Sequence, residues 1–289
     1  MERVGVDRRA SWVGSIPARA RVVREGLGLY LWLLGAQVRS QLQYRASFAL
    51  QFVGQGLATF VDFIAILLLF GRFPTLAGWS LGEVAFLYGL GGIAFALSDL
   101  FSGGFDRLSF TIQTGQFDRV LTRPVSVFLQ TLSMDFQIRR LGRVAQAAVA
   151  FVFSLTLVQI EWTPLRLLVM VIALISGVVI FCGIWVIGAA ITFWTVQTSE
   201  VTNVFTYGGS ALVEHPMSIY GRWLQRFFTF VVPLAFVTYL PALYILDRPD
   251  PLGLPGVLRF CSPLVAAAFY LLARAIWSFG VRHYQSTGS

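Results

Sequence analysis

Long apolar runs divide this chain, and six of them approach the roughly 20 residues that an α-helix needs to cross a bilayer. They lie at about 46–70, 82–102, 143–160, 166–192, 223–246 and 257–280. Short polar connections separate most of them, and one long polar segment, 103–143, separates the second from the third. The pattern predicts an all-α polytopic membrane protein with six transmembrane helices.

The fifth run is unusual because Pro233 and Pro241 interrupt it. Each proline removes a backbone donor and bends a helix. Such breaks are tolerated at membrane depth where neighbouring protein or water satisfies the freed carbonyls. We therefore expect a broken crossing at 223–246, preceded by a cytoplasmic connection at 197–222. A re-entrant hairpin, with the crossing displaced to about 197–214, is the alternative geometry.

Composition excludes a soluble domain. Of 289 residues, 56% are hydrophobic and only 12% are charged, whereas about a quarter of the residues in a soluble domain are charged. All 22 basic residues are arginine, and without lysine the chain cannot form the P-loop of an ATPase.

The arginines are distributed unevenly about the six runs. With the N-terminus inside, eighteen fall on the inner side, and only Arg72, Arg166, Arg248 and Arg259 fall outside. This positive-inside bias places both termini in the cytoplasm, including an arginine-rich segment at 1–28. Arginines beside apolar runs also contact lipid headgroups, so we expect membrane lipids as partners and no nucleic acid.

Residues 29–45 separate apolar from polar positions well enough for a helix along the membrane interface, with Trp32 and Tyr44 as headgroup anchors. The alternative is an inward extension of the first span.

Enzyme signatures are missing from the sequence. His215 and His283 stand far apart in polar stretches without a metal-binding pattern, and no serine lies in a nucleophile motif. We expect no catalytic residue, no metal site and no cofactor held by this chain.

A polar stripe runs along the first span, with spacings of four, four, four and three residues that place its members on one helical face. It consists of Ser47, Gln51, Gln55, Thr59 and Asp62. An acidic residue within a span usually faces a cavity or a partner. The stripe is either a translocation surface, with Asp62 toward a polar or cationic solute, or an interface of interhelical hydrogen bonds.

The coupling segment, Gly115–Pro124, stands inside the long polar segment and combines a turn, a short amphipathic helix and a proline stop. We expect an apolar knob of Phe117, Val120, Leu121 and Pro124, flanked by polar contacts. The polar members are Gln116, Asp118, Arg119 and Arg123. Contact with a protein partner is the preferred interpretation, and lipid binding is the alternative. For Arg139, Arg140 and Arg143, before the third span, a topology and lipid role is preferred.

Four sequence stretches resemble type-2 ABC transporter permeases of the six-span branch of export components. They are GQFDRVLTRPVS (115–126), EHPMSIY (214–220), FVVPLAFVTYLPA (230–242) and YQSTGS (284–289). The likeness covers about 27–289, which implies one ABC-2 type transmembrane domain at 29–289.

The resemblance also implies partners and a role. It implies a second permease subunit, either a copy or preferably a related chain, and two ATP-binding subunits that hold ATP and Mg. The coupling helix between the second and third spans would fall at 116–124. The expected function is export of an amphiphilic or cationic small molecule, a lipid or a peptide across a prokaryotic plasma membrane. A non-transporting scaffold or signalling subunit and an ion-coupled secondary transporter remain the alternatives.

Overall fold

The computed structural model describes residues 34–43, 45–195, 199–250 and 253–284, together with Gly28 and Tyr30. Most of the predicted N-terminal segment 1–28, the anchors Trp32 and Tyr44, and the tail after Tyr284 lie outside the described residues. Within the described part every regular element is a helix, and the five that are long and apolar enough to cross a membrane confirm a polytopic helical membrane protein.

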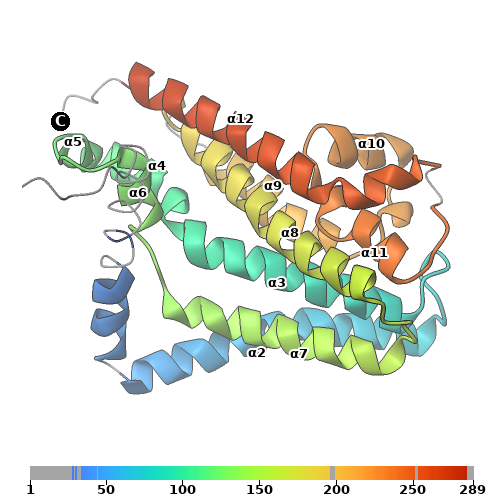
Figure 1. The fold of residues 1–289 in the computed structure, drawn as a ribbon. Helices are drawn as coiled ribbons and strands as arrows, with labels where there is room; N and C mark the ends of the chain where they lie inside the picture. The colour runs from blue at the N-terminus through green and yellow to red at the C-terminus, as the bar shows by residue number, and fades with distance from the viewer. Residues whose placement is uncertain are drawn as a thin grey trace, which may run out of the picture.

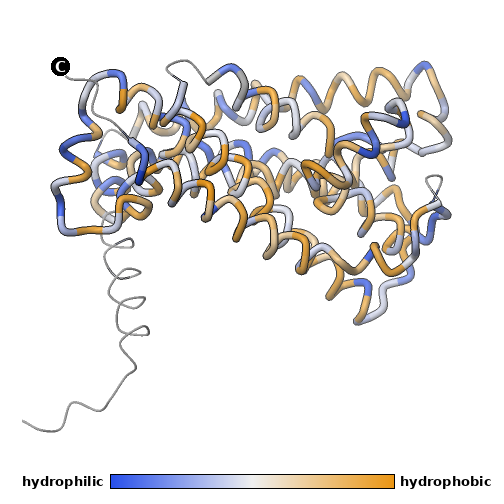
Figure 2. The backbone as a smooth tube through the Cα atoms, turned by 90° about the horizontal axis from the view of Figure 1, so that it is seen from above, coloured by the Kyte–Doolittle hydropathy of each residue, from blue (hydrophilic) through white to orange (hydrophobic). Residues whose placement is uncertain are grey.

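These five helices run roughly side by side through the length of the molecule (Figure 1). They are α2 (Arg45–Arg72), α3 (Leu81–Asp106), α7 (Leu141–Leu157), α8 (Pro164–Ile191) and α12 (Ser262–His283). Figure 2 shows that hydrophobic residues follow the long helices, while hydrophilic residues gather mainly toward the two ends of the bundle. Each helix overlaps one of the apolar runs in the sequence.

Helix α3 is the central element and is buried along most of its length. It packs against α7 and α8, while α2 lies against α7 and α12 lies against α8. Glycines allow the close approaches: a Cβ atom on Gly89 would lie 2.5 Å from the Cα atom of Phe151, and one on Gly142 would lie 2.2 Å from the carbonyl oxygen of Phe52. Small residues therefore hold α7 between α2 and α3.

Local signals fix where the central helices begin. Ser80 and Glu83 form a capping box at the start of α3, and Thr163 with Pro164 starts α8. The side chains of Ser80, Glu83 and Thr163 accept hydrogen bonds from backbone N–H groups of the first turn, which have no partner within the helix. Pro164 has no N–H group and so leaves no such donor. Glu83 also pairs with Arg248, whose guanidinium lies 4.5 Å from the centre of the Trp79 ring. These contacts tie the start of α3 to the loop after the fifth apolar run.

The fifth run differs from the sequence prediction. Residues expected to form a polar connection include α9 (Ser199–Val213), which packs against α8 and α3 and coincides with the segment 197–214 of the alternative geometry. The chain then forms η2 (Met217–Ile219), α10 (Arg222–Phe230), η3 (Leu234–Phe236) and α11 (Tyr239–Ile245).

Pro233 stands at a bend of 76° between α10 and the residues 234–245. Pro241 lies in the first turn of α11, where its missing N–H needs no partner, so it does not break that helix. The 223–246 range is therefore not one straight crossing. Both α10 and α11 lie toward the end opposite α4–α6, whereas the sequence prediction put the start of α10 on the same side as that segment (Figure 1).

Short helices connect the long ones at that other end. They are α4 (Leu108–Gln113), α5 (Phe117–Leu121), α6 (Val127–Leu132) and η1 (Ile138–Arg140), while η4 (Gly256–Phe260) precedes α12. Residues 34–42 are also helical. The side chains of Gln37 and Gln41 accept hydrogen bonds of 2.9 Å from the backbone N–H groups of Phe136 and Ile138. The first helical segment is thus fastened to the chain between α6 and α7.

Candidate functional site

The coupling segment folds as a short helix, α5, with one face covered and one face exposed. Gly115 ends α4 with φ of +67°, a left-handed conformation that favours glycine. On α5, Phe117 and Val120 are buried, whereas Arg119 and Leu121 are exposed. The expected apolar knob is therefore wrong for Phe117 and Val120, because these side chains face the protein interior.

The buried face of α5 rests on aromatic side chains from distant parts of the chain. The Phe117 ring lies 4.9 Å from Tyr284 and 5.5 Å from Phe193, centre to centre. The Tyr284 hydroxyl donates a hydrogen bond of 3.1 Å to the Asp118 carboxylate. Burial raises the pKa of the Tyr284 hydroxyl, and the neighbouring Asp118 raises this pKa further, so the donor proton is retained at neutral pH. The end of α12 therefore holds α5 in place.

The exposed face of α5 borders a groove of about 330 Å³, which we call the arginine groove. Its lining consists of Arg107, Phe110, Thr111, Gln116, Arg119, Val120, Arg123 and Met134. Phe110 is 61% exposed and gives the groove an apolar side chain. Leu121, Arg123 and Pro124 are exposed beside it. Three arginines and an exposed ring in one groove favour a partner that carries carboxylates and an apolar contact.

An ion-pair network shares Arg107 with the arginine groove. Arg140 pairs with Asp99 at 3.4 Å and with Asp135 at 3.0 Å. Arg107 pairs with Asp135 at 3.0 Å, and Arg143 pairs with Asp99 at 3.4 Å. The two aspartates are buried, and buried charges are retained where they are paired.

These contacts correct the sequence interpretation of the arginines before α7. Arg140 and Arg143 were expected to serve topology and lipid contact, but their side chains are only 13% and 19% exposed and join the network. Arg139 is exposed, so a lipid role remains open for it. Gly103 makes the arrangement possible, because a Cβ atom there would lie 1.6 Å from Nη1 of Arg140.

The polar stripe of α2 divides into two parts. Ser47 and Gln51 are exposed and share a hydrogen bond of 3.0 Å, and Gln55 is half-buried. Thr59 and Asp62 line a cavity of about 230 Å³, which we call the polar cavity. Its other lining residues are Tyr88, Gly92, Phe95, Arg143, Gln146, Tyr207, Ser210, Ala211 and Glu214.

Hydrogen bonds fix the walls of the polar cavity. Gln146 donates to the Tyr88 hydroxyl at 3.1 Å, and Tyr88 donates to the carbonyl oxygen of Thr59 at 3.1 Å. Ser210 donates to the Glu214 carboxylate at 3.0 Å. The cavity thus joins residues of α2, α3, α7 and α9 and is lined by two acidic side chains and one guanidinium.

Glu214 is the residue that sequence reasoning misplaced, because it was assigned to a cytoplasmic connection. The Glu214 side chain instead lies beside the middle of α3, because a Cβ atom placed on Gly92 would be 3.9 Å from its Oε1. A signal was available in the spacing of Asn203, Tyr207, Ser210 and Glu214 at four, three and four residues, which forms a polar stripe like that of α2. The low mean hydropathy of this stretch hid the helix from a search for apolar runs.

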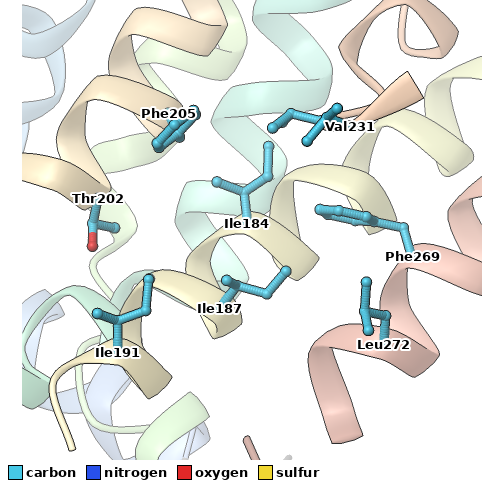
Figure 3. Close-up of a pocket in the computed structure, with 10 residues that line it drawn as sticks. Ile184, Ile187, Ile191, Thr202, Phe205, Val231, Phe269 and Leu272 are labelled. Atoms are coloured by element: carbon cyan, nitrogen blue, oxygen red, sulfur yellow. The ribbon is translucent and has the colours of Figure 1, made fainter. Parts of the chain in front are cut away.

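A second pocket, of about 210 Å³, is apolar (Figure 3). Ile184, Ile187 and Ile191 of α8 form one wall, and Phe205, Val231, Phe269 and Leu272 surround it. This pocket offers room for hydrocarbon, and none of its described lining residues is charged.

Replacing Phe117 tests how α5 is held. Phe117→Ala removes a buried ring and should destabilise the protein by about 3–5 kcal/mol, because the cavity left behind cannot fully collapse. The thermal midpoint of the detergent-purified protein should therefore fall. Leu121→Ala, an exposed change on the same helix, should leave it nearly unchanged. Equal midpoints for wild type and Phe117→Ala would contradict the observed packing.

Comparison with known proteins gives one match. The family model described as "ABC-2 family transporter protein" matches residues 57–288. No curated protein and no solved structure matches the chain. Among the described residues no group of three or more His, Cys, Asp or Glu side chains is placed to hold a metal ion.

Proposed function

Since the chain belongs to the ABC-2 family of transporter proteins and is a transmembrane component of an ABC transporter, we propose that it is the permease subunit of an ATP-driven exporter. Separate subunits would bind ATP and Mg and hydrolyse the nucleotide. The arginine groove is the observation that carries this proposal, because it presents Arg119 and Arg123 beside an exposed phenylalanine at one end of the helical bundle.

Force would reach the membrane through the coupling segment. ATP binding would draw two ATP-binding subunits together and push α5. Because Phe117 is packed against Phe193 and Tyr284, α5 would carry the ends of α8 and α12 with it. The ATP-binding subunits must bind two permease conformations with different affinity, since otherwise no work is transmitted.

A second permease subunit would complete the translocation path. Only 11% of the most apolar 18-residue window of α2 is buried within this chain. Leu50, Leu57 and Leu68 are each more than 60% exposed. An uncovered apolar helix that carries a polar stripe suits a contact with another subunit, either the same chain or a related one.

The solute would pass the polar cavity, where Asp62 and Glu214 would line the route. The family and the cavity together favour an amphiphilic or cationic small molecule, while lipid or peptide cargo remains compatible with the apolar pocket. Short outer connections, such as 71–81 and 161–165, leave little surface to capture a solute from outside, which supports export.

The exporter proposal is tested by recovering the ATP-binding subunit together with this chain. The tagged chain is purified in mild detergent from cells that co-express its neighbouring genes. We expect an ATPase to co-purify, and we expect its hydrolysis rate to change on reconstitution with the permease in lipid. Purification without any ATPase at full yield of the chain would overturn the proposal and favour a scaffold or an ion-coupled carrier.

A further inference from the structure

Arg143 belongs to two features at once. It lines the polar cavity together with Asp62 and Glu214, and it pairs with Asp99 of the ion-pair network. From Asp99 the ion pairs continue through Arg140 and Asp135 to Arg107, which lines the arginine groove. One guanidinium therefore connects the solute route with the surface offered to the ATP-binding subunit.

Within the polar cavity, Arg143 lies where an organic cation would be expected to bind. Its guanidinium carbon is 5.4 Å from the centre of the Phe95 ring and 5.8 Å from that of Tyr207. Cations are attracted to aromatic faces at such distances. The aromatic wall and the carboxylates of Asp62 and Glu214 thus form a cation-binding environment that already holds a side-chain cation.

The contact of Arg143 with Asp99 is incomplete. Arg140 and Arg143 both approach Oδ2 of Asp99, each at 3.4 Å. The other carboxylate oxygen, Oδ1, is buried and accepts no hydrogen bond from any described residue. Bidentate pairs at shorter distance are stronger. A shift of Arg143 toward Asp99 would therefore gain a partner for Oδ1.

We propose that the polar cavity binds an organic monocation, and that this cation displaces Arg143 from the aromatic wall onto Asp99. The proposal rests on the proposed exporter function and names its substrate class and its signal. In this arrangement the substrate's charge takes the place of Arg143 between Phe95, Tyr207 and the carboxylates. Arg143 then forms a closer pair with Asp99.

The ion-pair network carries this change outward. A tighter Arg143 pair on Asp99 weakens the competing hold of Asp99 on Arg140, and Arg140 then pairs more completely with Asp135. Asp135 also holds Arg107, which lines the arginine groove. Cation binding therefore alters the groove that the ATP-binding subunit contacts, and linkage requires that nucleotide-driven changes at the groove alter cation affinity in return.

Binding is tested on the complete complex in nanodiscs of neutral phosphatidylcholine. Phenyltrimethylammonium is the probe, and benzenesulfonate, of similar size and opposite charge, is its control. We expect the cation alone to bind, and Glu214→Gln to weaken it about tenfold, which is 1.4 kcal/mol. Glu200→Gln, an exposed change on the same helix α9, should leave the affinity unchanged. Equal binding of both ions, or equal affinity in Glu214→Gln, would overturn the site.

Arg143→Gln tests the displacement. Removal of the competing guanidinium should raise the affinity for phenyltrimethylammonium several-fold while abolishing stimulation of ATP hydrolysis by the cation. A purely structural role for Arg143 would not raise the affinity. Unchanged or weaker binding would therefore overturn the displacement.

Asp135→Asn separates binding from signal transmission, since Asp135 does not line the polar cavity. The cation should still bind, but its effect on the hydrolysis rate should disappear. Persistence of the full effect would show that the network does not carry the signal. All these outcomes are measured on a complex that contains an ATPase, so a negative result here leaves the exporter proposal standing.

Discussion

Reversing two charges in the arginine groove, Arg119→Glu with Arg123→Glu, should separate the permease from its ATP-binding subunit. Arginines at the centre of an interface often contribute about 2 kcal/mol or more each, and reversal adds repulsion against an acidic partner. We expect affinity to fall at least about 100-fold, since 1.4 kcal/mol corresponds to a factor of ten. Co-purification of the ATPase and transport should both be lost.

The chain offers a matched control for this pair. Arg39 and Arg282 are exposed and lie outside the arginine groove. Their double replacement by glutamate changes the net charge equally and should leave ATPase recovery close to wild type. Both double variants should elute at the same position in size exclusion, because neither disturbs a buried contact. An unchanged ATPase yield in the groove variant would refute the docking assignment.

Much of the transmembrane architecture is predictable from the sequence. Apolar runs such as 82–102 and 166–192 correspond to α3 and α8, because a span needs about 20 apolar residues whatever surrounds it. Helix α9 falls in the segment 197–214, which the sequence offered only as the alternative crossing, for the same reason. It has only 15 residues and carries a polar face toward the polar cavity. Its role depends on α2, α3 and α7, and local composition does not contain that information.

The candidate site was predicted in part. The segment 115–124 was singled out correctly as a structured turn and helix, but a five-residue helix has no periodicity that shows which face is covered. Tyr284 and Phe193, which cover Phe117, are 167 and 76 positions away along the chain. The partners Asp99 and Arg140 are likewise 41 positions apart. Charge counting alone therefore assigned Arg140 to the lipid.

Arg140→Met should destabilise the protein strongly. Arg140 donates to the carboxylate and the backbone carbonyl of Asp135 and to the carbonyl of Asp99, each at 3.0 Å. Removing one partner from a buried ion pair costs about 3–5 kcal/mol, because the remaining charge is left without compensation. Methionine keeps much of the side-chain length, so the loss reports charge more than volume. The thermal midpoint of the purified protein should fall markedly.

Two further variants identify the cause of that loss. Arg139→Met changes an exposed neighbour and should have little effect on the midpoint. Adding Asp99→Asn and Asp135→Asn to Arg140→Met removes the carboxylates left unpaired, and the midpoint should partly recover, because the energetic cost lies in buried uncompensated charge. A triple variant less stable than Arg140→Met would show instead that the amides fail to satisfy the remaining donors of Arg107 and Arg143. In that case hydrogen bonding, and not charge balance, holds α3, α7 and the chain around Asp135 together.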